Sequence, residues 1–187
     1  HSSIYGKVIA IEDSPHPVIG ISKAIIIESD GQDLKAPLAS IPGKDISALS
    51  KEDILALIKE AGIVGLGGAA FPTFVKLSPP PNKKIEVLII NGAECEPFLT
   101  CDHRLMLEKP KEIISGVHLI AKVLGVKDIV IGIEENKLDA LESMRSALFR
   151  VKGEACAVRV VNLKTRYPQG GEKQLVKALL NREVPSG

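Results

Sequence analysis

Glu86-Val87-Leu88-Ile89-Ile90-Asn91-Gly92 is the stretch that decides the fold. Its apolar run is continuous, as in strands that are buried on both faces of a parallel sheet. Further apolar runs alternate with helical patterns downstream, the runs at 128–133 and 155–163 and the helical patterns at 111–124, 137–149 and 171–180. This alternation predicts parallel strands that are joined by right-handed crossovers. We therefore expect an α/β domain with a mostly parallel, Rossmann-like sheet and helices on both faces.

The first part of the chain has a different character. Tyr5–Ile11 and Ala24–Glu28 are short β-branched runs, separated by prolines and glycine. We expect two or three short strands in a β-rich unit at 1–42, the remnant of a larger domain, followed by the α/β domain at 43–187. Because the sequence starts without Met and stops just after a helical pattern, we expect it to be a piece of a longer protein.

A glycine-rich loop precedes the first strand of the α/β domain. It contains Gly65, Gly67 and Gly68, with Phe71 close behind. Such a run can turn successive backbone N–H groups toward one anion, since no side chain intervenes. The spacing matches neither the dinucleotide fingerprint nor a P-loop, and an ordinary turn is an equally open interpretation.

Polar groups follow the ends of the predicted strands. Asn91 ends the first, Glu134-Glu135 follow the second, and Tyr167-Pro168-Gln169-Gly170-Gly171 follow the third. Ligands bind beyond the carboxyl ends of strands in open α/β sheets. We therefore expect these segments to gather at one edge of the sheet as a binding site. In the polar segment 91–108 we expect Asp102 and Arg104 to form a structural ion pair.

Composition excludes several classes of function. The 24 basic and 23 acidic residues give a net charge of +1, and aromatic residues make up 3% with no Trp, so nothing favours a nucleic-acid partner. Three cysteines are too few for a disulfide framework, and their spacing predicts no metal site. No apolar run reaches the roughly 20 residues of a membrane span.

Three segments together resemble a known family. They are similar to the flavin- and NADH-binding module of the complex I flavoprotein subunit, and more closely to the C subunit of the Rnf electron-transport complex. The three segments are Gly65–Lys76, Asn91–Pro97 with Asp102–Glu108, and Tyr167–Leu175. The resemblance covers about 50–187. The β-rich start resembles the end of the N-terminal barrel-sandwich domain in that Rnf protein.

This resemblance implies cofactors, partners and a location. FMN would be held noncovalently with NADH above it, and hydride would pass from NADH to FMN. Electrons would continue to [4Fe-4S] clusters elsewhere in the full-length protein. The partners implied are the other subunits of an ion-translocating membrane complex, and ferredoxin through it, with the module peripheral on the cytoplasmic face of the bacterial inner membrane.

The resemblance also implies roles for residues of the glycine loop and its surroundings. Backbone N–H groups of Gly65, Gly67 and Gly68 would approach the FMN, and Lys76 would hold its phosphate or ribityl oxygens. Phe71 would stack on the adenine of NADH. Without the resemblance, Lys76 fits a surface lysine and Phe71 a core residue.

The strand-end loops have implied roles as well. Asn91 would face the pyrimidine edge of the flavin, and Glu94 and Glu96 would act at the reacting site on ribose or nicotinamide groups. Tyr167, Gly170, Gly171 and Glu172 would form a second loop, with the following helix pointing its N-terminus at the phosphate. Structural alternatives are a strand-end cap for Asn91, loop caps for Glu94 or Glu96, and a dipole-complementing acid for Glu172.

The chain departs from the complex I pattern at four positions, with Leu66 in place of Arg, Ala70 in place of Gly, Ala93 in place of Asp and Gly171 in place of Glu. Fewer charged contacts to cofactor or nucleotide follow. The alternatives to the Rnf assignment are a related soluble flavoprotein, such as a microcompartment cobalamin reductase, and a cofactor-free scaffold.

Overall fold

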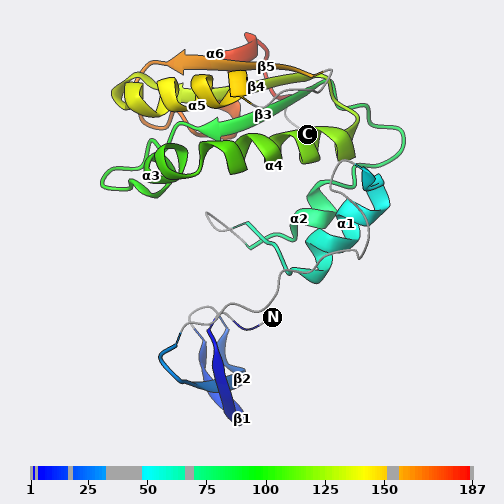
Figure 1. Cartoon of the computed structure of the whole chain (residues 1–187), viewed down its shortest axis with the longest axis vertical. Helices are drawn as coiled ribbons and strands as arrows, with labels where there is room; N and C mark the ends of the chain where they lie inside the picture. Colours follow the sequence, from blue (N-terminus) through cyan, green and yellow to red (C-terminus); the bar gives the residue numbers. More distant parts are fainter. Residues whose placement is uncertain are drawn as a thin grey trace.

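A computed structural model describes residues 2, 4–16, 19–32, 48–65, 70–150 and 156–185. Its first elements are the strands β1 (Gly6–His16) and β2 (Gly20–Ser29), which pair antiparallel. Both are longer than the apolar runs that predicted them. Figure 1 shows this hairpin at the end of the molecule away from the larger sheet.

The larger sheet has three parallel strands in the order β3 (Val87–Gly92), β4 (Asp128–Glu134) and β5 (Ala157–Leu163). The pairing register sets Asn91 opposite Gly132 and Glu134 opposite Leu163. All three strands point the same way in Figure 1, so their carboxyl ends share one edge. The predicted α/β class with a parallel sheet is confirmed.

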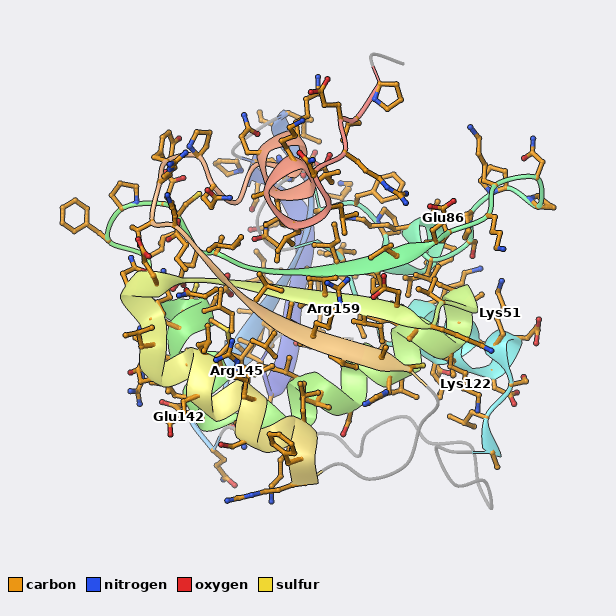
Figure 2. All side chains as sticks on the ribbon, turned by 90° about the horizontal axis from the view of Figure 1, so that it is seen from above. Lys51, Glu86, Lys122, Glu142, Arg145 and Arg159 are labelled. Carbon is orange, nitrogen blue, oxygen red and sulfur yellow. The ribbon has the colours of Figure 1, made fainter. Side chains whose placement is uncertain are left out.

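Helices cover both faces of this sheet, as Figure 2 shows with α6 above it and α4 and α5 below. The bounds are α3 (Cys101–Glu108), α4 (Pro110–Leu124), α5 (Leu138–Arg150) and α6 (Glu172–Leu180), with a 3₁₀ turn η2 (Glu135–Lys137) after β4. Ile131 and Ile133 pack with Met106, Ile114 and Met144 on the α3–α5 face.

The α6 face of the sheet is built around a glycine. A Cβ at Gly132 would lie 2.8 Å from Leu163 Cδ1 and within 3.3 Å of the Cδ1 atoms of Leu175 and Leu179. The absence of a side chain there lets α6 approach β4 closely. On the opposite face, the guanidinium of Arg145 on α5 donates to the Val160 carbonyl oxygen of β5 (3.1 Å; Figure 2).

Two further helices precede the sheet, α1 (Lys51–Glu60) and the short α2 (Thr73–Lys76). A capping box begins α1, because Ser50 Oγ accepts from the Asp53 N–H and the Asp53 carboxylate accepts from the Ser50 N–H. Ile54 packs against Val123 of α4. None of the helices in the described ranges has the length and apolar character needed to cross a bilayer.

Candidate functional site

A cleft of ≈ 440 Å³ opens at the carboxyl ends of the three parallel strands. It is lined by the loop after β3, the turn after β4 and the loop after β5, through residues 94–100, His103, Glu134, Asn136, Lys137 and 165–167. Three of the predicted site residues, Glu94, Glu96 and Tyr167, come together here from two different loops. Segments far apart in sequence therefore meet where the sheet topology places a ligand site.

Asn91 and Cys95 connect the first of these loops to the last. The Asn91 side-chain amide donates to the Gly170 carbonyl oxygen at 2.9 Å, and Asn91 Oδ1 accepts from the Ala93 N–H at 3.2 Å. Cys95 Sγ accepts from the Gly170 N–H at 3.2 Å. Asn91 thus makes the contacts of a strand-end cap, which the sequence left open as its alternative role. Gly170 is held through both its carbonyl oxygen and its N–H group.

Glu94 caps the helix that follows it. Its backbone has a φ of +47°, and its two carboxylate oxygens accept from the N–H groups of Asp102 (2.6 Å) and His103 (3.1 Å) at the start of α3. A carboxylate at a helix N-terminus satisfies donors that have no partner within the helix. Each oxygen keeps a second lone pair for another donor.

Burial and the neighbouring Glu94 carboxylate raise the pKa of Asp102, and the Lys137 ammonium opposes the shift. Ligand atoms of Glu94, Cys101 and Asp102 lie within 4.8 Å of one another. Each Glu94 oxygen also accepts from one of the two helix amides.

One polar pair joins α3 to α5, and another lies within α3. His103 Nε2 lies 2.8 Å from Asp139 Oδ1 at the start of α5, and this hydrogen bond lowers the pKa of Asp139. Arg104 Nε donates to Glu108 Oε1 at 3.1 Å. The expected Asp102–Arg104 pair is wrong, because residues two apart lie on different sides of a helix whereas residues four apart are neighbours.

The glycine loop is closed at its base. The Gly65 N–H donates to the Phe71 carbonyl oxygen at 3.0 Å, and Val64 bridges Pro72. Gly67 and Gly68 lie outside the described residues. Phe71 is 55% exposed rather than a core residue, and Lys76 is exposed at the end of α2. Gly65, Phe71 and Lys76 are not among the residues that line the strand-end cleft.

The second predicted loop joins the cleft to α6. Tyr167 is 70% exposed, Gly171 is the N-cap of α6, and Glu172 is an exposed first-turn acid. Arg166 and Tyr167 also line a neighbouring hollow of ≈ 490 Å³ with Lys173 and Lys177 of α6. An aromatic face, basic side chains and a helix start are thus grouped beside the cleft.

Sequence patterns placed Glu134 at this edge of the sheet but did not single out Lys137, Phe98 or Arg166. Lys137 is buried beneath the cleft and donates to the Ala93 carbonyl oxygen at 2.9 Å, and Glu134 is buried with it. Phe98 has a φ of +66° and is fully exposed at the rim, where Arg166 also lies. The spacing Glu134-x-x-Lys137 directly after a buried strand was the available signal for Lys137.

The cleft therefore offers exposed rings from Phe98 and Tyr167, carboxylates from Glu94 and Glu96, and the Arg166 cation. Aromatic faces can stack on a planar heterocycle, while carboxylates accept from ribose hydroxyl or amide donors and a guanidinium binds phosphate. This donor set fits a nucleotide-like molecule with a planar ring.

A family model described as the Nuo51 FMN-binding domain matches residues 58–187. The chain is 50% identical to the C subunit of the proton-translocating ferredoxin:NAD(+) oxidoreductase complex of Clostridium ljungdahlii. It is 45% identical to the C subunit of the Na(+)-translocating ferredoxin:NAD(+) oxidoreductase complex of Acetobacterium woodii. Both alignments cover 100% of this chain, which spans 40% and 41% of the length of these two relatives.

Among solved structures, the crystal structure of an NAD+-reducing [NiFe]-hydrogenase in the air-oxidized state is similar, with a TM-score of 0.64 and 25% identity. The match covers 70% of this chain and 24% of that chain.

Proposed function

The chain belongs to the Nuo51 FMN-binding domain family, and we propose that it is the FMN- and NADH-binding module of a membrane-associated, Rnf-type NADH:ferredoxin oxidoreductase. The observation that carries this proposal is the meeting of three strand-end loops around one cleft that combines aromatic, carboxylate and guanidinium groups. The names of the two relatives support electron transfer between ferredoxin and NAD(+).

In this proposal the protein's own residues bind and orient, while the cofactor supplies the redox chemistry. When bound, FMN would supply the hydride-accepting and single-electron chemistry between NADH and the later electron carriers. Tyr167 and Phe98 flank the ring system, and Arg166 faces phosphate. Glu96 accepts from the nucleotide's hydroxyl or amide groups. Positioning of the two rings is the main contribution that the protein makes to such a transfer.

The remaining predicted residues keep their proposed roles. Lys76, Phe71 and the glycines 65, 67 and 68 would contact the FMN from outside the strand-end cleft, and Gly170, Gly171 and Glu172 would present the start of α6 to phosphate. Asn91 and Glu94 shape the loop after β3 and offer their remaining lone pairs to the ligand.

The proposal also covers the rest of the protein. Residues 1–42 would be the remnant of a barrel-sandwich domain and residues 43–187 the binding module. Electrons would leave for [4Fe-4S] clusters outside these residues, and then for ferredoxin through the other subunits. The module would lie peripherally on the cytoplasmic face of the inner membrane. The relatives' names give protons for one and Na(+) for the other as the translocated ion.

A cofactor-free scaffold is the second candidate, and one observation favours it. The Gly65 N–H, the Asn91 amide and the Glu94 carboxylate all have partners within the protein, so the fold uses these groups without a ligand.

Titration of the intact protein into FMN, followed by flavin fluorescence, separates the two candidates. We expect quenching at micromolar protein and bleaching of the flavin absorbance when NADH is added. Unquenched FMN at micromolar protein would contradict the redox assignment and favour the scaffold.

A further inference from the structure

Glu134 and Lys137 form a buried ion pair under the strand-end cleft. Their side chains are 1% and 7% exposed, and Lys137 Nζ lies 3.4 Å from Glu134 Oε2. Among the described residues, these are the two charged side chains that are buried. In the other ion pairs that the described residues form with one another, at least one of the two side chains is exposed. In Asp128–Arg159, for example, the side chains are 45% and 51% exposed.

The pair contacts all three loops that form the cleft. Lys137 Nζ donates to the carbonyl oxygens of Ala93 (2.9 Å) and Glu94 (3.4 Å) in the loop after β3. It also contacts Asn136 Oδ1 at 3.1 Å in the turn after β4. Glu134 Oε1 accepts from the Arg166 N–H at 3.2 Å in the loop after β5.

The ammonium group has three protons for four acceptors, so Lys137 is fully used within the protein. Replacing a buried ion pair by apolar residues of similar volume is often neutral or stabilising, because desolvation offsets the attraction. Stability alone therefore gives a weak reason for this pair. Its directional bonds to three separate loops give a stronger one, since the bonds to the loops after β3 and β5 fix backbone groups at a set distance.

We propose that Glu134 and Lys137 are positioning residues that hold the three strand-end loops at the spacing that the cleft needs to bind its cofactor. This inference rests on the proposed function. Neither residue needs to touch the reacting atoms, because each acts through the backbone of the residues it binds: Lys137 through 93 and 94, and Glu134 through 166.

The pair predicts different effects for two variants. Glu134→Gln keeps one side-chain oxygen, which Lys137 can retain, while the amide nitrogen cannot accept from the Arg166 N–H. Glu134→Gln/Lys137→Met removes both charges at nearly constant volume, and so avoids the unpaired buried carboxylate that Lys137→Met alone would leave. The control is Asp128→Asn/Arg159→Met. It removes an exposed pair that joins β4 and β5 near their amino ends, away from the cleft.

Amide hydrogen exchange of the intact protein, resolved by residue, is the first readout. We expect faster exchange at Arg166 in Glu134→Gln. In the double variant we expect faster exchange at Arg166 and also at Asp102 and His103, whose N–H groups are held by Glu94. Core amides of β4 should keep the parent rate in both. A uniform acceleration of all amides would show a merely structural role and overturn the proposal.

FMN affinity is the second readout, measured by fluorescence quenching at a temperature where melting curves show every variant folded. We expect the double variant to bind FMN roughly tenfold to a hundredfold more weakly than the parent, and the control pair to bind like the parent. Parent affinity together with parent exchange in the double variant would overturn the proposal. If the double variant does not fold, Glu134→Gln decides by the same two measurements.

The two readouts separate this proposal from the proposed function. A parent protein that leaves FMN unquenched contradicts the proposed function, whereas the exchange pattern reports loop positioning without any cofactor. Local acceleration confined to the three loops supports positioning in either case, and its absence contradicts it.

Discussion

The side-chain amide of Asn91, the penultimate residue of β3, donates to the carbonyl oxygen of Gly170, 79 residues later, at 2.9 Å. Together with the bond from the Gly170 N–H to Cys95 Sγ, it fastens the loop after β5 to the loop after β3. The cleft between strand ends therefore depends on a polar contact that no local sequence pattern encodes.

Asn91→Asp tests this contact with almost no change in shape. The carboxylate cannot donate to the Gly170 carbonyl oxygen and repels it, so we expect a loss of about 1–3 kcal/mol in the free energy of unfolding. Urea denaturation measures this loss. Unfolding at the parent's urea midpoint would show that the contact does not hold the loops.

Gly170→Ala tests how tightly the loop is held. The new Cβ would lie 3.3 Å from Cys95 Sγ and 3.5 Å from both Asn91 side-chain polar atoms. We expect a destabilisation of about 1–2 kcal/mol from this crowding, measured by thermal melting. Gly116→Ala on α4 is the control, since its Cβ meets nothing within 4 Å, and it should stabilise the helix by about 0.5–1 kcal/mol. Equal melting temperatures for the two variants would contradict the tight fit.

Glu94→Ala removes the cap of α3. Two N–H groups lose a charged acceptor, so we expect unfolding to become easier by about 1–2 kcal/mol in a urea titration. Glu52→Ala is the control, because Glu52 is an exposed acid in the first turn of α1, and its loss should cost less than about 0.5 kcal/mol. A Glu94 variant as stable as the Glu52 variant would show that the cap is not needed.

Asp102→Asn gives a pH-dependent prediction. Burial and Glu94 raise the pKa of Asp102 above 3.8 in the folded state, so the folded protein holds this proton more tightly than the unfolded one. Stability then falls as pH rises from the ordinary pKa through the raised one. We expect the variant to melt above the parent at pH 7, with the difference shrinking toward zero near about pH 3. A difference that does not change with pH would contradict the shift.

The regular parts of the fold could be predicted from sequence because their signals are local. The run Val87–Ile90 identified β3, and the spacing Ser50-x-x-Asp53 is a local capping-box signal at the start of α1. The helix α3 was missed, since segment 91–108 shows no clear periodicity and the acid that caps the helix lies in the preceding loop. When a side chain from a preceding loop caps a helix, the residues at the helix start contain no capping motif.

The site could be predicted only in outline. Strand-end topology placed Glu134 and Tyr167 at one edge, and the structure brings Glu94 and Glu96 to the same cleft, while their roles stay predictions. Lys137 could not be recognised, because a sequence does not show that acceptors from the loop after β3 and from the end of β4 surround it. The contribution of Gly67 and Gly68 remains a prediction, as these residues lie outside the described ranges.

FMN binding by two aromatic variants tests the central claim most directly. Tyr167→Leu removes an exposed ring from the cleft, and Phe149→Leu removes an exposed ring from α5 that does not line it. In fluorescence titrations of the intact protein, we expect the Tyr167 variant to bind FMN about tenfold more weakly, as the loss of one stacking contact implies, and the Phe149 variant to bind like the parent. Parent affinity in the Tyr167 variant would contradict the placement of the cofactor in the strand-end cleft.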